Sequence, residues 1–571
     1  MSGEFQVSGT NPAALFTLKL HRGDGMTLVA MNWRKGKPPN DFVGFAIQYK
    51  EPGGDRFYDL KNRLTFLRKD GTVDPAQLST MRSPIQKFRW VHFPRNADLD
   101  GEFLYRVTPV FMNAQDELSY GEAQEAGIEL RRETYPGQLN VSYTRGFVSS
   151  QAFVDRYAKF GPISTLLPAS ADDGLKFKPT HPKTKEALEW MGFEARQSIL
   201  DTLDEAIKDK ATVRVIAYEL NEPEVVDRLV KIGKRLKVVI DNSTGHQAGS
   251  AESQAATRLA ASAGKANVKR QCMKKLQHNK TIVVDGPKVQ KVVCGSTNFS
   301  WRGFFVQSNN AMVLEGKNAV KVFLAAFDNY WDNEKGFGNT ACAKWTEIGL
   351  KSIDAHVAFS PHAKSNALLA TVADDIGGKT TSCLFYSLAF LYQTKGPILD
   401  AIKKVSESDR IFVYGISDKK VGGIDLQRPD GNVSPVYAAA LAKDVPAPFS
   451  EEPTGATGKA SGIRLHHKFV VIDFDKPSAR VYMGSYNFSG AADTQNGENL
   501  LVIRDRRIAV SYMIEAVRIF DHYEFRVVQQ DAKKARKTLQ LARPPRKTGE
   551  KPWWDDDYTN ARKARDRELF S

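Results

Sequence analysis

One eight-residue pattern occurs twice in this chain of 571 residues, and no other feature limits its fold as strongly. It reads HNKTIVVD at 278–285 and HHKFVVID at 466–473. Each copy is followed by a second shared segment, CGSTNFS at 294–300 and MGSYNFS at 483–489. Similar segments in the same order and at nearly the same offset indicate two copies of one structural unit. The period is too long for a solenoid, so we expect two similar halves packed about a pseudo-two-fold axis.

A third pair of similar segments extends the repeat upstream. ILDTLDEAIKDKATVRVIAYEL at 199–220 resembles ILDAIKKVSESDRIFVYGIS at 398–417. Between residues 186 and 242 the sequence alternates between helical periodicity and short apolar runs of the buried-strand type. Alternation of strands and helices indicates an α/β layered domain. We therefore expect two α/β halves with mixed sheets, at residues 140–345 and 350–530.

Residues 1–135 precede the repeat and have the pattern of an all-β domain. Segments such as FTLKL (16–20) and FLYRVTPVFM (103–112) are rich in β-branched or aromatic residues, and Gly, Pro, Asn and Asp separate them. This pattern predicts a β-sandwich. One series of residues resembles a fibronectin type III domain: Trp33, Pro38, Pro39, Phe45, Tyr49, Tyr105, Arg106 and Val107. We expect this domain to bind or to act as a spacer, through contact with a protein or a surface.

Two segments lack such patterns. Residues 418–463 contain many Gly, Pro, Ser and Ala residues, which predicts a long loop that leads into the second motif. Residues 531–571 contain KKARK and RPPRK before WWDDDY. We expect a basic, solvated C-terminal tail there. The alternative is an electrostatic contact with an anionic polymer or surface.

Composition favours an anionic partner. The formal net charge is +15, and a basic surface attracts nucleic acids and anionic lipid headgroups alike. No stretch approaches the roughly 18 apolar residues of a membrane helix, and MSGEFQVSGTNPAALF is not a secretory signal. The cysteines show no zinc spacing: Cys272, Cys294, Cys342 and Cys383. Reduced, structural cysteines indicate a cytoplasmic setting by default, with export that needs no signal peptide as an alternative.

The repeated pattern contains the groups needed to cleave a phosphodiester without a metal. Such a reaction requires a nucleophile, cations to offset charge on the phosphoryl oxygens, and an acid for the leaving oxygen. Two histidines and two lysines meet these needs. On a β-strand, residues two apart point to the same face, so His and Lys of each H-x-K would face the reacting group together.

These residues resemble the phospholipase D superfamily, whose pattern is HxKxxxxD followed by GSxN. Both copies match it, and the resemblance covers roughly residues 140–530. The resemblance implies one site assembled from both copies, with these catalytic residues: His278, Lys280, Asn298, His466, Lys468, Asn487, Glu498, Asp285 and Asp473. Lys280, Lys468, Asn298 and Asn487 would also bind substrate, together with Ser296 and Ser485. Asp285 and Asp473 complete the motif, and in the family this position is more structural than chemical.

The two copies differ at one position that matters to the chemistry. Copy two has Glu498 where copy one has Asn309. In the family, an acidic residue near this point hydrogen-bonds the active histidine. A carboxylate beside an imidazole favours the protonated ring, so we expect Glu498 to support His466 as the general acid. An amide partner would leave His278 neutral and suited to attack phosphorus. Glu315 is a candidate substitute for the missing carboxylate.

The sequence therefore predicts a phosphoric diester hydrolase that needs no cofactor and no metal. The resemblance favours hydrolysis of a phospholipid headgroup ester through a phosphohistidine, because the family's simple nucleases more often carry one motif and dimerise. A nuclease that cleaves DNA or RNA by the same two-histidine mechanism is the alternative. An inactive enzyme whose β-sandwich binds a partner is the third reading, and the complete motifs argue against it.

Overall fold

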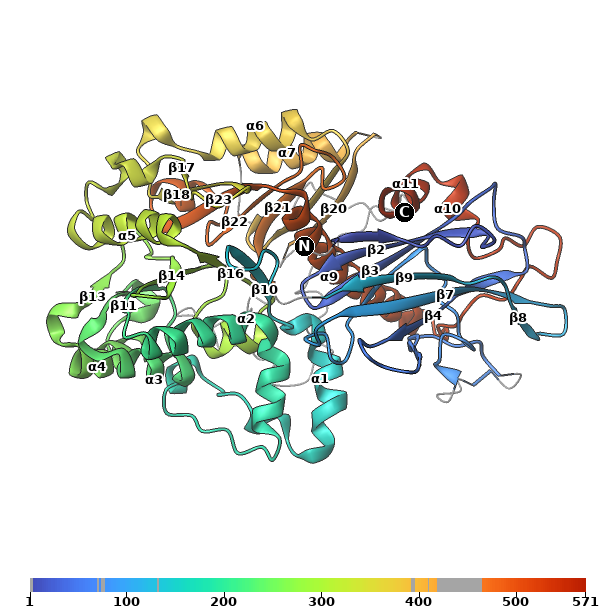
Figure 1. Cartoon of the computed structure of the whole chain (residues 1–571), viewed down its shortest axis with the longest axis horizontal. Coiled ribbons are helices and arrows are strands. Elements are labelled where there is room, and N and C mark those ends of the chain that lie inside the picture. Colours follow the sequence, from blue (N-terminus) through green and yellow to red (C-terminus); the bar gives the residue numbers. More distant parts are fainter. Residues whose placement is uncertain are drawn as a thin grey trace. The chain divides into compact units, whose positions relative to one another are not determined.

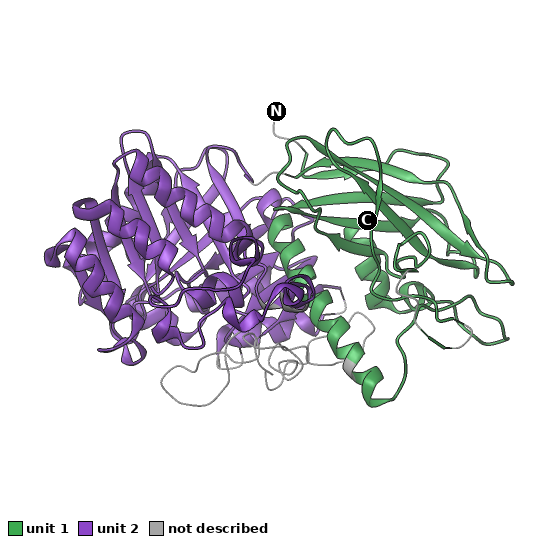
Figure 2. Cartoon of the chain, turned by 90° about the horizontal axis from the view of Figure 1, so that it is seen from below, with its two compact units in different colours: residues 1–132, 426–434, 510–571 green, residues 133–425, 435–509 purple. Residues whose placement is uncertain are grey.

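A computed structural model describes residues 4–68, 71–72, 77–130, 133–391, 396–408, 410–417 and 465–571. The predicted loop at 418–463 lies outside these residues. The chain forms two compact units, which Figure 2 shows in different colours. The described part of one unit falls within residues 1–132 and 510–571, and that of the other within 133–509.

The first unit contains the predicted β-sandwich (Figure 1). Two antiparallel sheets have the orders β1-β2-β3-β6 and β5-β4-β7-β8, with β9 paired to β7. Their strands are β1 (Gln6–Ser8), β2 (Phe16–Gly23), β3 (Met26–Trp33), β4 (Phe42–Lys50), β5 (Tyr58–Asp59), β6 (Arg89–His92), β7 (Glu102–Met112), β8 (Leu118–Tyr120) and β9 (Gln124–Glu129). Alternate residues such as Phe16, Leu18 and Leu20 of β2 enter one core, as the period of a half-buried strand requires.

The C-terminal residues complete this unit, so the predicted solvated tail at 531–571 is wrong. Their helices are α9 (Arg506–Lys534), α10 (Asp556–Thr559) and α11 (Ala561–Phe570). Trp554 belongs to the sandwich core, and the indole N–H of Trp553 donates to the carbonyl of Phe42 at 3.0 Å. Burial of these aromatic surfaces stabilises the contact, whereas a solvated tail would leave them in water. The second half also ends earlier than predicted, because the chain from Val510 belongs to the first unit.

The second unit contains two seven-stranded mixed sheets, as the repeat predicts. The first, β10-β16-β15-β14-β11-β12-β13, comprises β10 (Leu139–Tyr143), β11 (Thr212–Ala217), β12 (Leu236–Asp241), β13 (Val268–Gln271), β14 (Lys280–Asp285), β15 (Gln290–Gly295) and β16 (Asn310–Glu315). The second, β17-β18-β23-β22-β21-β19-β20, comprises β17 (Thr346–Glu347), β18 (Asp354–Ser360), β19 (Cys383–Leu388), β20 (Phe412–Ile416), β21 (Lys468–Ile472), β22 (Arg480–Gly484) and β23 (Glu498–Arg504). The strand order from β10 to β12 recurs from β18 to β20.

Helices cover these sheets. They are α1 (Ser150–Tyr157), α2 (Thr184–Lys208), α3 (Pro223–Ile232), α4 (Ala251–Ala263), α5 (Lys317–Asp332), α6 (Leu369–Lys379), α7 (Pro397–Ser406) and the short α8 (Gly490–Thr494). Figure 1 shows α2, α3 and α4 on one side of the first sheet and α5 on the other, and α6 and α7 beside the second sheet. The central strands β14 and β21 are therefore buried, which explains their runs of apolar residues.

The strand pairing corrects one part of the predicted repeat. Ala217 of β11 lies opposite Lys280, and Leu388 of β19 lies opposite Lys468. Strand β11 therefore corresponds to β19, whereas the similarity of segments 199–220 and 398–417 predicts that it corresponds to β20. The mismatch arose because α3–β12 and α7–β20 have the same helix-then-strand pattern as their neighbours. Periodicity alone does not distinguish consecutive helix–strand pairs.

Candidate active site

The two motif histidines lie close together at the start of the central strands. Strand β14 begins at the motif lysine Lys280, and His278 lies two residues before it. In the same way, β21 begins at Lys468, two residues after His466. The imidazole centroids are 6.4 Å apart, and both residues are 3% exposed. The histidines thus stand just before the strands and not within them. The structure nevertheless brings both motifs into one site.

Backbone hydrogen bonds hold each histidine segment against the other half. The amide of His278 donates to the carbonyl of Gly497 at 2.8 Å, and that of His466 donates to Ser308 at 3.1 Å. Isolated bridges join Gln277 to Gly497 and Ser308 to Leu465. His278 is consequently placed beside Glu498, which begins β23 of the second half. His466 is placed beside Asn309, which directly precedes β16 of the first half.

This exchange reverses the predicted pairing of the histidines. Nδ1 of His278 lies 3.0 Å from Oε2 of Glu498, and Nδ1 of His466 lies 2.9 Å from Oδ1 of Asn309. The prediction that Glu498 supports His466 is wrong, because Glu498 directly follows Gly497, to which His278 is bonded. Glu315 does not replace it, since it closes β16 and pairs with Lys291 at 3.5 Å.

The environment of His466 fixes its tautomer. Nδ1 faces two acceptors, the carbonyl oxygen of Ser296 at 3.2 Å and Oδ1 of Asn309. The Asn309 amide has one orientation, because its Nδ2 donates to the carbonyl of Gly303 at 3.0 Å. Two acceptors require a proton on Nδ1. Nε2 of His466 is therefore the atom that can give or take a proton in a reaction.

Burial keeps the His278–Glu498 pair free of separated charge. Burial raises the pKa of Glu498 to about 8, although Asn496 donates to its Oε1 at 2.9 Å. Burial and then Lys280 and Lys468 hold the pKa of His278 well below its usual value. The ring is consequently neutral in the free protein, and its Nδ1 shares a hydrogen bond with the carboxyl group. A neutral ring held through Nδ1 has its Nε2 lone pair available for attack.

Both motif lysines lie in the same buried environment. Nζ of Lys280 donates to the carbonyl of His278 at 2.5 Å, and Nζ of Lys468 donates to that of His466 at 2.7 Å. Burial lowers the pKa of Lys280 to about 7 and holds that of Lys468 well below its usual value. A bound anion would restore their positive charge, because an opposite charge nearby favours the ionised form.

The motif asparagines and serines have different surroundings. Among the described residues, neither Oδ1 nor Nδ2 of the buried Asn298 has a hydrogen-bond partner, and Oδ1 of Asn487 has none. Unpaired buried amides suit contact with a ligand. In contrast, the hydroxyl of Ser296 donates to Oδ1 of Asn309 at 2.9 Å, and that of Ser485 accepts from the amide of Asn499 at 3.0 Å. Each hydroxyl is thus bonded to a residue in or directly before the neighbouring strand, β16 or β23. Because these hydroxyls already have partners within the protein, the predicted contacts of Ser296 and Ser485 with substrate are not favoured.

Neither motif aspartate lies beside the histidines. Asp285 closes β14, about 16 Å along the strand from Lys280 at roughly 3.3 Å per residue, and it accepts from Gln290. The carboxylate of Asp473 accepts from the amides of Thr381, Ser382 and Cys383. These bonds fix the start of β19. The prediction that Asp285 and Asp473 are catalytic is therefore wrong, because both carboxylates bond within the protein away from the histidines.

Three further residues approach the site without having been predicted. Tyr218 packs edge-on against His278 with ring centroids 4.6 Å apart, and Nζ of Lys280 lies 4.8 Å from the Tyr218 ring. In the second half, the Phe390 and His466 centroids are 6.3 Å apart. Glu219 accepts from the hydroxyl of Ser300 at 2.6 Å. These residues follow β11 and β19, so correct pairing of those strands with the motif strands would have located them.

Two negative observations apply to the described residues only. No cluster of three or more His, Cys, Asp or Glu side chains among them is arranged to hold a metal ion. None of their helices combines the length and the apolar composition needed to cross a membrane.

Comparison with known proteins places this site in a family. The family described as cardiolipin synthase, PLD-like domain, matches residues 199–331 and 379–519, which include both motifs. The chain belongs to the phospholipase D superfamily. It is 33% identical over 122 residues to a phospholipase D of Rickettsia bellii, covering 20% of this chain and 58% of that relative. It is 46% identical over 55 residues to a phospholipase D of Rickettsia felis, covering 10% and 25%. The chain thus spans less than two thirds of these curated relatives.

Among solved structures, the superfamily member resembles the phosphatidylserine synthase of Haemophilus influenzae, with 13% identity and a TM-score of 0.41 over 60% of this chain and 92% of that one. It also resembles Nuc, a phospholipase D family member from Salmonella typhimurium, with 28% identity and a TM-score of 0.21 over 24% and 87%. Both scores are low, so membership rests on the family match and the paired motifs.

Proposed function

We propose that this protein is a phosphodiesterase that hydrolyses a phospholipid headgroup ester through a phosphohistidine on His278. The observation that carries the proposal is the pair of imidazoles with centroids 6.4 Å apart, each held through Nδ1 by a residue of the opposite half. A phosphate between the rings would have a nucleophile on one side and an acid on the other.

In the first step, Nε2 of His278 attacks phosphorus and the bond to the leaving oxygen breaks. The leaving oxygen takes the Nε2 proton of His466. That ring must enter the step as imidazolium, because Nδ1 also carries a proton. Burial and then Lys468 and Lys280 hold the pKa of His466 well below its usual value in the free protein, so the negative charge of the bound phosphodiester is needed to favour the protonated ring.

Attack makes the His278 ring cationic, and Oε2 of Glu498 stabilises that cation by accepting the hydrogen bond from its Nδ1–H. The new positive charge beside Glu498 also lowers the pKa of this carboxyl group from its raised value and so favours its ionised form. Lys280, Lys468 and the amide N–H groups of Asn298 and Asn487 would hold the phosphoryl oxygens.

In the second step, water attacks the phosphohistidine. His466 has given up its Nε2 proton and keeps the one on Nδ1, because Ser296 and Asn309 both accept there. Its free Nε2 therefore removes a proton from water as the new oxygen–phosphorus bond forms. The phosphorus–nitrogen bond breaks, its electron pair returns to His278, and both histidines recover their starting protonation.

The choice of substrate rests on the relatives. The relatives from Rickettsia bellii and Rickettsia felis are both named phospholipase D. This name favours a phospholipid substrate over a nucleic acid. The net charge of +15 suits either anion. A nuclease therefore remains the second candidate, and one experiment separates the two.

Purified protein is incubated with phospholipid vesicles labelled in the headgroup or, in parallel, at phosphorus, and separately with labelled DNA and RNA, all in excess chelator. We expect release of the headgroup and no cleavage of nucleic acid. Rapid acid-free quenching and peptide mapping should find the phosphoryl label on His278. Cleavage of nucleic acid alone would replace the substrate assignment. Label on His466 would reverse the roles, and activity that requires an added divalent ion would contradict the mechanism.

A further inference from the structure

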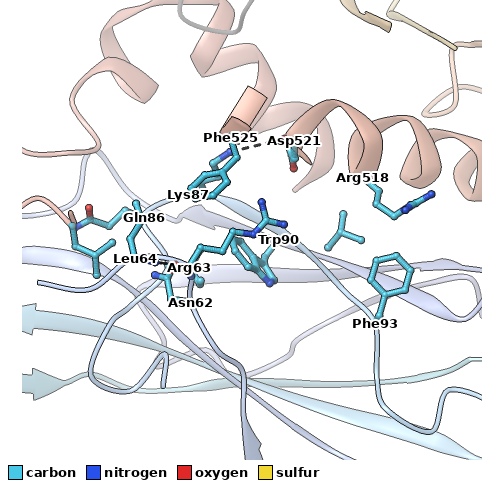
Figure 3. Close-up of a pocket in the computed structure, with 13 residues that line it drawn as sticks. Asn62, Arg63, Leu64, Gln86, Lys87, Trp90, Phe93, Arg518, Asp521 and Phe525 are labelled. Atoms are coloured by element: carbon cyan, nitrogen blue, oxygen red, sulfur yellow. Dashed lines mark hydrogen bonds and ion pairs between the residues drawn. The ribbon is translucent and has the colours of Figure 1, made fainter. Parts of the chain in front are cut away.

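A second candidate binding site lies in the β-sandwich unit. A pocket of about 280 Å³ is lined by residues 62–64, by residues in and on either side of β6, by side chains of α9 and by Leu541 (Figure 3). All of its lining residues belong to this one unit. Its volume is near the lower end of small-molecule sites, which range over about 300–1,000 Å³. It could therefore accept one short chain or one ring system.

The walls of this pocket are largely apolar. They are formed by Leu64, Ile85, Trp90, Val91, Phe93, Phe525 and Leu541. Ile85 and Leu541 are buried, whereas the three aromatic residues, labelled in Figure 3, are only partly buried. Partly exposed aromatic surface around a cavity favours an apolar ligand, because binding removes that surface from water.

Charged side chains surround the same pocket, and most of them already have partners. Arg518 holds Glu515 through two bonds of 2.7 and 2.5 Å. Asp521 pairs with Arg89 at 2.6 Å and approaches Lys87 at 3.9 Å. Lys87 also lies 3.4 Å from Glu524. These charges are therefore balanced within the protein.

Arg63 differs from the other cations of the pocket. Its guanidinium lies 5.0 Å from the Phe525 ring centroid and 5.7 Å from that of Trp90, above the indole in Figure 3. No described carboxylate lies within 4.0 Å of its guanidinium, although Asp521 is near enough for its charge to act on Arg63, and the residue is exposed. A planar, permanently charged guanidinium stacked on aromatic faces is well suited to receive a carboxylate or phosphate.

We propose that this pocket binds an amphiphilic anion, with a single apolar tail against Trp90 and Phe525 and a carboxylate or phosphate head on Arg63. A free amphiphile and the chain of a bilayer lipid share this chemistry. The proposal is independent of the phosphodiesterase site, because no motif residue contributes to the pocket.

The test measures binding of monomeric decanoate to the full chain by titration calorimetry. Decanol keeps the chain without the charge, and butyrate keeps the charge with little chain. We expect saturable binding of decanoate and roughly tenfold weaker binding of each analogue. Arg63→Gln should weaken decanoate about tenfold and leave decanol unchanged. Arg56→Gln, an exposed arginine over Tyr58 in the same unit, is the matched control and should bind decanoate normally.

Two further arms make the result decisive. Leu64→Trp, which fills the pocket, should abolish binding of both decanoate and decanol while the circular dichroism spectrum stays native. If decanoate fails to bind but vesicles containing phosphatidate bind in an Arg63-dependent way, the ligand is a bilayer lipid. Absence of both interactions would overturn the proposal. Equal binding of decanoate and decanol with no effect of Arg63→Gln would do the same.

Discussion

At the scale of single residues, the two histidines differ in the group that each hydrogen-bonds. A carboxyl group faces Nδ1 of His278, and an amide with a carbonyl faces Nδ1 of His466. An oxygen of that carboxyl group can stabilise the cation formed on His278 by attack, because it accepts the hydrogen bond from Nδ1–H. The neutral acceptors at His466 fix a tautomer without favouring a permanent charge. This asymmetry assigns the two roles more directly than motif order does.

The role of His466 gives a prediction about leaving groups. His466→Asn removes the acid, and general acid catalysis typically contributes 10²–10⁴-fold. We expect a loss of about that size with alkyl phosphodiesters and a much smaller one with nitrophenyl phosphodiesters, whose leaving oxygen needs little protonation. His278→Asn should abolish turnover of both. Measured kcat/KM values for the two substrate classes check this, and equal losses in His466→Asn would contradict the acid role.

The lysine pKa gives a prediction about pH. Burial lowers the pKa of Lys280 to about 7, so the free protein loses this charge as pH rises through 7. Because kcat/KM reports ionisations of the free enzyme, it should fall above about pH 7. Lys280→Arg keeps its charge at all working pH values, so that variant should be less active at neutral pH but should lose this alkaline fall. An unchanged profile would show that another group titrates.

At the scale of elements, the turn after β15 determines how His466 is held. Gly295 has φ of +139°, and a Cβ there would lie 2.6 Å from the carbonyl oxygen of Asn310. The next residue, Ser296, supplies the carbonyl that accepts from His466. Glycine is thus required both by the backbone angle and by the approach of β16.

Gly295→Ala tests this turn. Backbone strain of this kind costs about 1–3 kcal/mol, and the clash adds to it. We expect lower stability in denaturant and reduced kcat, since His466 loses its fixed position. Gly490→Ala, at the first residue of α8 where a Cβ meets nothing within 4 Å, should change neither. If the two variants behaved alike, the requirement for glycine at Gly295 would be refuted.

Local sequence patterns predict individual strands but not the contacts between distant segments. Apolar runs and turn residues located β2, β7, β11, β14 and β21, because those patterns are local. The contact of Glu498 with His278 depends on the backbone hydrogen bond between His278 and Gly497, which are residues far apart in the chain. No local pattern encodes such a bond. The same limit explains why Tyr218 and Phe390, located by strand pairing, were missed.

At the scale of the whole molecule, the α/β unit is inserted into the β-sandwich unit along the chain. Residues 1–132 begin the sandwich unit, and residues 510–571 complete it. A basic composition around KKARK and RPPRK suggested a tail, whereas the later aromatic residues are part of a core. Charge content describes the solvated face of a segment and says little about its buried face.

This arrangement predicts that the C-terminus stabilises the first strands of the chain. Trp554 is 5% exposed in the cluster that contains Phe16 and Phe45. Trp554→Ala should therefore destabilise the sandwich by about 3–5 kcal/mol and accelerate amide hydrogen exchange in β2 and β4. Exchange in β14 should change less, because local unfolding follows the contacts that were lost. Leu99→Ala, at a residue 40% exposed in the same unit, is the control and should have little effect. Exchange in β2 and β4 that stayed at the wild-type rate would mean that the C-terminal residues act as the solvated tail that composition predicts.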